Sequence, residues 1–349
     1  MKNINPLGLF DDHFLMEKLT KLGDPLEKLN THIDWKIFEP LLEKSFSIEN
    51  KDLSKGGRPP FSKLILFKAL IIQSMYNLSD DQLEYQIVDR ASFKRFLGLK
   101  KSDKVPDSKT FWLFREDLIR KDVIMGLFKI FNETLDAAGI FANEGKIVDA
   151  SFVEVPRQRN TRGENKHIKD TGTAPKEWKE KPNKLSQKDT DARWTKKNNA
   201  SFYGYKNHVK ADKKTKLIEE YLVTSASVHD SQAIEELLTE RDKGQEIYAD
   251  SAYTGEEQEK TYKQKEVIAK INEKGYRNKP LTEEQKTNNK EKSKVRARVE
   301  HIFGFMENSM HGSFVRTIGM LRAQAKIGMM NITYNISRCV QLNIVVKMG

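Results

Sequence analysis

The chain has 349 residues, enough for two domains with a sizeable core. Its 61 lysine and arginine residues against 50 aspartate and glutamate residues give a net charge of +11, which favours a polyanionic partner such as nucleic acid. The single cysteine, Cys339, excludes a disulfide framework and a cysteine-based zinc site. Neither a bilayer-spanning apolar run nor a signal-peptide pattern is visible, so we expect a cytoplasmic protein without membrane contact.

The first 122 residues are predicted to form a helical N-terminal domain. The stretch GGRPP breaks the chain, and the apolar stretch FSKLILFKALIIQSMY then begins a helix that we expect to be buried between others. Ser79 and Gln82 have the spacing of a capping box at the start of the next helix. Short, tightly connected helices with positive charge at Lys109 and Arg115 are typical of a helix-turn-helix unit that binds DNA. A plain helical bundle with a solvated basic face fits the same pattern.

Residues 123–349 are predicted to form a second domain, of the α+β or α/β class. It begins with a helix, which is followed by the strand KIVDASFVEV and, after an insertion, by a hairpin from YGYKNH to VTSASVHD. A helix, the strand EIYAD, a helix and the strand EVIAKI come next, and helices continue to the end. Three consecutive strands, a crossover helix and two further strands favour a mixed sheet with helices packed on it. This is the order of a ribonuclease H-like fold, in which the first and fourth strands lie side by side.

Three acidic residues fall at informative places in this order. Asp149 lies on the first strand, Asp250 ends the fourth, and Glu300 lies on the helix after the last strand. Crowded carboxylates repel one another unless a cation joins them, and oxygen ligands without cysteine or paired histidine suit Mg²⁺ or Mn²⁺. Two such ions clamp the attacking and leaving oxygens of a phosphoryl transfer, so we expect the three carboxylates to converge within about 4–8 Å.

Each acidic residue also has an ordinary structural interpretation. Asp250 suits a turn or a helix cap, and Asp149 suits a strand-end cap. Glu300 and Arg296, four residues earlier, can form a helix ion pair worth about 0.3–0.5 kcal/mol. All three acids together, in this strand order and on a basic chain, favour the metal site.

Four other side chains follow strand ends close to the expected site. Lys206 is a candidate phosphate contact, and Tyr253 either stacks on a DNA base or packs inside the domain. His208 and His229 either make structural hydrogen bonds or act near the scissile phosphate.

A basic insertion is expected at about residues 157–201, directly after the first strand. It has no apolar periodicity, and stretches of this length without structure of their own are functional or disordered. We expect it to lie over one side of the active-site face and to become ordered on DNA, with Lys196 and Lys197 holding phosphates. Trp178 and Trp194 either contact a DNA strand or anchor the insertion to the body.

Six motifs of the second domain together are highly specific for one family: VDASFVEVPRQRNTR, KDTDARWTKKN, YGYKNHVKAD, TSASVHDSQ, YADSAYTG and RVEHIFGFM. The stretch from GRPPFSK to FLGLKKSDKVPDSKTFWLFRE is similar to the helical N-terminal domain of the same family. Over nearly its whole length the chain resembles a DDE transposase of a bacterial insertion sequence, of the insertion-sequence-five type and related to the insertion-sequence-four superfamily. The resemblance implies that Asp149, Asp250 and Glu300 form the catalytic triad and bind two Mg²⁺ or Mn²⁺ ions.

One motif departs from the family pattern. Related transposases carry a Tyr, Arg, Glu, Lys signature on the last catalytic helix, and Arg296 and Glu300 match its middle. Ser293 stands in the place of the tyrosine and Glu307 in the place of the lysine. In relatives these two residues help hold phosphate and DNA, and neither of them is present here.

The resemblance implies DNA cleavage and strand transfer at the terminal inverted repeats of an insertion sequence. The partners would be the repeats and target DNA, with a homodimer on DNA in the bacterial cytoplasm. A DNA-binding regulator with structural carboxylates and a Mg²⁺-dependent nuclease without strand transfer are the alternatives.

Overall fold

The computed structural model describes residues 11–46, 60–155, 158–197, 199–277 and 279–347. They form two compact units: Met1–Thr134 together with Ile336–Gly349, and Leu135–Asn335. The sequence predicts a domain boundary between residues 122 and 123, whereas the structure divides the chain after Thr134 and returns its last residues to the first unit. The helix that begins at Val123 belongs largely to the first unit because its Phe131 stacks on Phe38, with ring centroids 5.9 Å apart.

The first unit is helical. Its elements are α1 (Asp11–Lys21), α2 (Pro25–His32), η1 (Trp35–Phe38), α3 (Glu39–Phe46), α4 (Lys63–Tyr76), α5 (Asp80–Asp89), α6 (Ala91–Leu97), α7 (Ser108–Arg120) and most of α8 (Val123–Ala137). Helix α4 carries nine buried residues, as its apolar sequence predicts. The capping box of Ser79 and Gln82 is confirmed at the start of α5.

The helices of the first unit are tied together by polar contacts as well as by their core. Arg115 on α7 donates two hydrogen bonds of 2.7 Å to the carboxylate of Asp80 on α5. Near the other end of the unit, Ile33 forms a parallel bridge with Val346. The Val346 backbone donates to His32 at 2.7 Å and accepts from Asp34 at 2.9 Å.

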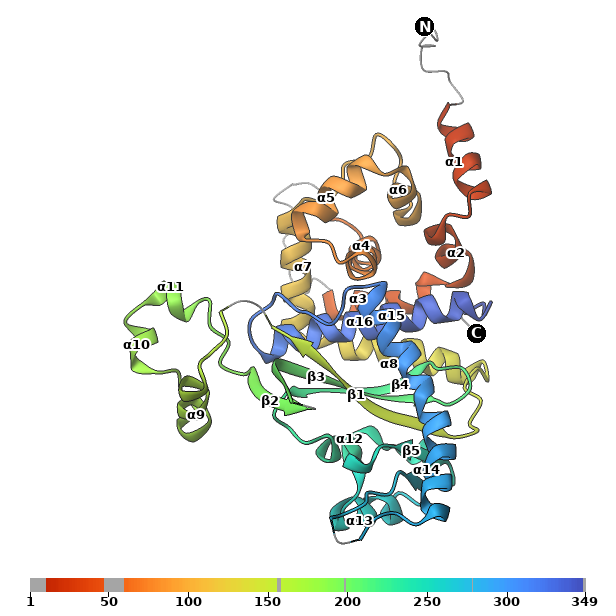
Figure 1. Ribbon diagram of the computed structural model, residues 1–349. Helices are drawn as coiled ribbons and strands as arrows, with labels where there is room; N and C mark the ends of the chain where they lie inside the picture. Colours follow the sequence, from red (N-terminus) through yellow and green to blue (C-terminus); the bar gives the residue numbers. More distant parts are fainter. Residues whose placement is uncertain (1–10, 47–59, 156–157, 198, 278, 348–349) are drawn as a thin grey trace, which may run out of the picture. The chain divides into compact units, whose positions relative to one another are not determined.

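The second unit is built on a mixed sheet (Figure 1). Its strands are β1 (Lys146–Glu154), β2 (Arg193–Lys197), β3 (Ala200–Asp212), β4 (Ile218–Ser225), β5 (Glu246–Ala249) and β6 (Ile268–Ile271). The order is β2-β3-β1-β5-β6, and β4 also pairs with β3. Strand β1 is antiparallel to β3 and parallel to β5, which carries the EIYAD sequence. The expected adjacency of these two strands is therefore confirmed.

Helices cover both faces of this sheet. They are α12 (Ile234–Leu237), α13 (Glu256–Gln264), α14 (Glu283–Arg296), α15 (Glu300–Asn308) and the larger part of α16 (Met320–Gln341). On one face, Val148 of β1 joins a core cluster with Ile234 and Tyr262 from α12 and α13. On the other face, Asn207 of β3 exchanges hydrogen bonds with Asn331 of α16. None of the helices that the structure describes is long and apolar enough to cross a membrane.

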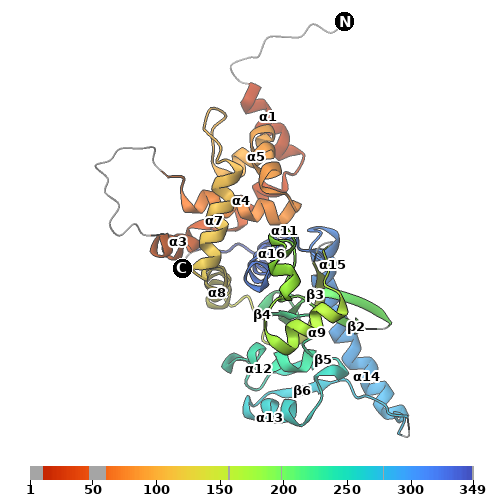
Figure 2. The ribbon, with the colours of Figure 1, turned by 90° about the vertical axis from the view of Figure 1, so that its left-hand side faces the viewer.

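The insertion has more structure than its composition indicated. Its described residues form α9 (Arg162–Thr171), α10 (Lys176–Lys179), α11 (Pro182–Leu185) and the sheet strand β2, and Arg157 and Asn198 lie outside the described residues. Figure 1 shows the three helices projecting to one side beyond β2, and in Figure 2, viewed from that side, α9 and α11 lie in front of the sheet. Trp178 is fully buried, and its indole N–H donates to Glu164 at 2.9 Å. The indole N–H of Trp194 donates to the Asn160 carbonyl at 2.7 Å. Trp178 therefore packs within the insertion, whereas the ring of Trp194 also contacts Tyr203 of β3, with centroids 5.0 Å apart.

Candidate active site

The sheet brings two of the three expected acidic residues to one place. In the parallel pairing of β1 with β5, Lys146 lies opposite Ile247 and Ile147 lies opposite Tyr248. Two residues further along the same register, Asp149 is level with Asp250. The charge of Asp250 also acts on the Asp149 carboxyl, so the two acidic groups lie near each other at this end of the sheet.

Asp149 is buried and doubly hydrogen-bonded. Its Oδ1 accepts from the Ala150 N–H at 2.8 Å, and its Oδ2 accepts from Nη1 of Arg296 at 2.7 Å. Burial raises the pKa of the Asp149 carboxyl to about 6, and the charge of Asp250 acts in the same direction. The Ala150 hydrogen bond opposes this rise in pKa, as do the charges of Arg296 and Lys197.

Asp250 follows the last residue of β5 and begins a short turn. Its Oδ1 accepts from the Ala252 N–H at 2.8 Å and caps η5 (Ser251–Tyr253). Among the described residues, its Oδ2 has no hydrogen-bond partner. One oxygen of Asp250 therefore caps the turn, and the other is available to a ligand.

Glu300 does not join the two aspartates in this structure. Its side chain is exposed, and no group of three or more histidine, cysteine, aspartate or glutamate side chains in the described part of the chain is arranged to hold a metal ion. The expected convergence of three carboxylates is absent. Helix α14 ends at Arg296, and a 3₁₀ turn, η6 (Ala297–Val299), separates it from α15, which begins at Glu300.

This break changes which side chains share a helix edge. A 3₁₀ turn advances about 120° per residue and an α-helix about 100°, so three 3₁₀ residues rotate Glu300 by roughly 60° relative to an unbroken helix. Arg296 takes the position beside Asp149 instead. Arg296 was expected to contact DNA or to pair with Glu300; its bond to Asp149 had no signal in the sequence.

The aspartate pair suits a hard divalent cation. It offers carboxylate oxygens without sulfur or imidazole ligands, and it already attracts a cationic side chain to Asp149. Nε of Arg296 is buried without a hydrogen-bond partner among the described residues, so the guanidinium is only partly satisfied at this position. The two aspartates therefore fit the expected ion.

Lys206 and His208 lie on the opposite face of the sheet from Asp149. His208 is paired with Ala150, the neighbour of Asp149, and successive side chains of a strand alternate between the faces. Nζ of Lys206 donates to Asp230 and to the Val228 carbonyl, both at 2.7 Å. These contacts give Lys206 a structural role, and a phosphate contact stays a prediction.

His208 is fully buried, with its Nε2 2.8 Å from Oγ1 of Thr224. Burial lowers the pKa of its imidazole to about 4, which keeps the ring neutral near pH 7. His229 accepts a hydrogen bond from the Ser231 N–H and caps a short 3₁₀ turn. The structural alternative describes what both histidines do in this structure.

The remaining predicted contacts divide by exposure. Tyr253 is fully buried in the core cluster, which favours packing over stacking on a base. Arg115 is held by Asp80, whereas Lys109 is exposed on α7. Lys196 and Lys197 are exposed on β2, and Nζ of Lys197 lies over the Phe152 ring, 5.8 Å from its centroid.

Comparison with known proteins shows the family. The family described as "Transposase DDE domain" matches residues 141–336, more than half of the chain. The chain belongs to this family. As a DDE-type transposase it also matches "Transposase domain (DUF772)" over residues 13–117, within the first unit.

One solved structure is also similar. It is described as a cryo-EM structure of the piggyBac transposase synaptic complex with hairpin DNA. The similarity covers 95% of this chain and 78% of that one, at 12% sequence identity and a TM-score of 0.44.

Proposed function

We propose that this transposase cuts DNA at the terminal inverted repeats of a bacterial insertion sequence and joins the ends to target DNA. The observation that carries the proposal is the register of β1 and β5, which sets Asp149 level with Asp250 in a chain of the DDE transposase family. The insertion-sequence-five type is the subgroup that its motifs resemble most.

Asp149, Asp250 and Glu300 would hold two Mg²⁺ or Mn²⁺ ions. Bound there, the ions would activate water and then a DNA 3′-hydroxyl for attack on a phosphodiester. The three acidic residues differ in how firmly the fold holds them. Asp149 and Asp250 are fixed by the sheet and by hydrogen bonds, whereas Glu300 follows a break in a helix and would complete the group only by changing its position relative to Asp149.

Contacts to DNA would come mainly from exposed lysines. Lys196 and Lys197 stand on β2 near enough for Lys197 to influence the pKa of Asp149, and Lys109 is exposed on α7 in the proposed repeat-binding domain. A homodimer on DNA would allow two ends to be cut in concert.

The proposal is tested by replacing Asp250 with Asn and incubating the purified protein with repeat DNA and Mg²⁺. We expect cleavage to be lost while DNA binding stays equal or becomes tighter, because the change removes negative charge that faces phosphate. Glu257→Gln, an exposed acid on α13, is the matched control and should cut normally. Cleavage by Asp250→Asn at the wild-type rate would refute the assignment.

An added target plasmid separates the alternatives. Joined products identify a transposase, and cutting without joining identifies a nuclease. The ion pair of Asp149 with Arg296 and the exposed Glu300 are the observations that favour a DNA-binding regulator, which would bind repeat DNA and neither cut nor join it.

A further inference from the structure

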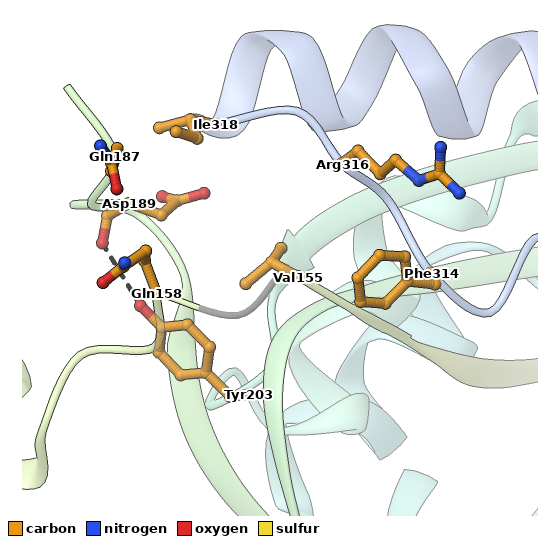
Figure 3. Close-up of a pocket in the computed structure, with 8 residues that line it drawn as sticks. All are labelled: Val155, Gln158, Gln187, Asp189, Tyr203, Phe314, Arg316 and Ile318. Carbon is orange, nitrogen blue, oxygen red and sulfur yellow. Dashed lines mark hydrogen bonds between the residues drawn. The ribbon is translucent and has the colours of Figure 1, made fainter. Parts of the chain in front are cut away.

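The second unit contains a cavity of about 490 Å³, within the range of about 300–1,000 Å³ typical of small-molecule sites. Its lining comes from the end of β1, the insertion, β3 and the segment after α15. The lining residues are Val155, Gln158, Gln187, Asp189, Tyr203, Phe314, Arg316 and Ile318 (Figure 3). None of them was singled out in the sequence, where an aromatic and a basic residue in the short SFVRTIG stretch were the available signal.

The walls of this cavity are held by hydrogen bonds between its segments. Oδ2 of Asp189 accepts from the Tyr205 hydroxyl at 2.8 Å and from the Gly319 N–H at 3.0 Å. Its Oδ1 accepts from two backbone N–H groups of the insertion. The Val315 N–H donates to the Glu154 carbonyl at 2.9 Å. The cavity is therefore built before a ligand arrives, and the Asp189 carboxylate is already occupied by donors.

Several polar side chains at the mouth of the cavity are available to contact a ligand. Gln158, Gln187 and Arg316 are exposed, and no hydrogen bond or ion pair with another described residue engages their side chains. Phe314 is 38% exposed. Figure 3 shows Phe314 and Arg316 on one side of the hollow and the two glutamines on the other, with Val155 between them.

These groups match the parts of a nucleotide. An aromatic ring face stacks on a base, a glutamine amide can donate to and accept from a base edge, and a guanidinium pairs with phosphate. The occupied Asp189 carboxylate gives no reason to expect a cation. Because Val155 is six residues after Asp149, the cavity lies about 20 Å along β1 from the aspartates, or about six nucleotides of DNA.

We propose that this cavity receives one unstacked nucleotide of the DNA substrate, about six nucleotides from the scissile phosphate. Phe314 stacks on the base, Arg316 holds its phosphate, and the glutamines contact the base edge. The inference rests on the proposed function, because DNA is the source of the nucleotide.

The test measures binding of the full chain to duplexes made from the DNA that flanks the gene. One unpaired nucleotide is introduced at each position in turn, and the fully paired duplex is the reference. We expect one position to bind about tenfold tighter, the affinity equivalent of one base stacked on an aromatic ring. Phe314→Ala should lose this gain, so that the unpaired and the paired duplex bind equally, and Phe314→Tyr should keep it.

Tyr276→Ala, which removes an exposed aromatic residue elsewhere in the unit, is the matched control and should keep the gain. The inference fails if no position binds more tightly, or if Phe314→Ala keeps the gain or weakens both duplexes equally. Micromolar, Phe314-dependent binding of free deoxyadenosine monophosphate without DNA would make a free nucleotide the ligand and would also overturn it. If the protein cuts repeat DNA but no unpaired position binds more tightly, the nucleotide-binding role of the cavity is refuted and the proposed function stands. If the protein neither binds nor cuts that DNA, the proposed function is refuted as well.

Discussion

Arg296 and Asp149 form a partly exposed ion pair at the point where a metal ion is proposed to bind. Their 2.7 Å contact joins a carboxylate that is 9% exposed to a guanidinium that is 26% exposed. A buried carboxylate without a positive neighbour is costly, and the group then takes up a proton or attracts a cation. We infer that Arg296 balances the charge of Asp149 until a metal ion takes its place.

Replacing Arg296 with Gln should therefore lower stability and increase the response to metal. We expect a loss of about 1–3 kcal/mol at pH 7, because the Asp149 carboxylate loses a charged hydrogen-bond donor. Added Mg²⁺ should raise the melting temperature of the variant more than that of the wild type. In the control Asp149→Asn/Arg296→Gln, the loss of stability and the stronger response to Mg²⁺ should both largely disappear. If both persist in full, the ion pair of Asp149 with Arg296 is not their cause.

His208 should make stability depend on acidity. Its pKa falls from 6.5 in the unfolded chain to about 4 in the folded protein. Between these values the unfolded chain binds a proton at this residue that the folded protein does not, so the contribution of His208 to stability is lost as the pH falls from 6.5 toward 4. The loss is on the order of 3 kcal/mol, and it should be absent in His208→Gln.

This dependence is measured by urea unfolding at a series of pH values. His167, exposed on α9, provides the control, and His167→Gln should keep the wild-type pH dependence. An unchanged acid response in His208→Gln would place the titrating group elsewhere.

At the scale of elements, the strand β2 changes what the basic insertion can do. The strand pairs with β3 from Arg193 to Lys197, which fixes two exposed lysines on the edge of the sheet. A preformed edge holds phosphates without a large ordering cost, since the backbone is already fixed. The insertion need not become ordered on DNA in order to contribute.

Replacing Lys196 and Lys197 together with Ala should weaken binding to repeat DNA and to random DNA by similar factors. The slope of log K against log salt should become shallower by about 2, because about one counterion is released per lysine. The matched control replaces Lys214 and Lys243, two exposed lysines paired with glutamates, and should change little. A loss confined to the repeats would mean that this edge reads bases.

The order of the main strands was predictable, because β-branched stretches ending in polar residues mark β1 and β5 whatever surrounds them. The break at Ala297–Val299 was not, since the sequence there reads as a continuous helix and tertiary packing decides the geometry. The structure of the insertion was missed although Thr161 and Glu164 have capping-box spacing before α9. The small core of the insertion depends on Trp178, and no periodic pattern in the sequence predicts that this residue is buried.

At the scale of the whole molecule, the net charge of +11 makes a prediction about salt. Binding to DNA should fall steeply, with a slope near −0.9 for each phosphate contacted. Fluorescence titrations at several salt concentrations give this slope. A nearly flat dependence would exclude binding dominated by the DNA backbone and would require another partner for the excess charge.

The bridge between Ile33 and Val346 has a consequence for protein synthesis. A ribosome makes the helices of the first unit early, yet two residues that are almost fully buried there, Ile33 and Val346, stand more than 300 positions apart in the sequence. The first unit therefore cannot reach its final packing until residues 336–349 have been translated. A nascent or prematurely terminated chain would lack a finished first unit. If that unit recognises the repeats, repeat recognition would be reserved for chains translated through these residues.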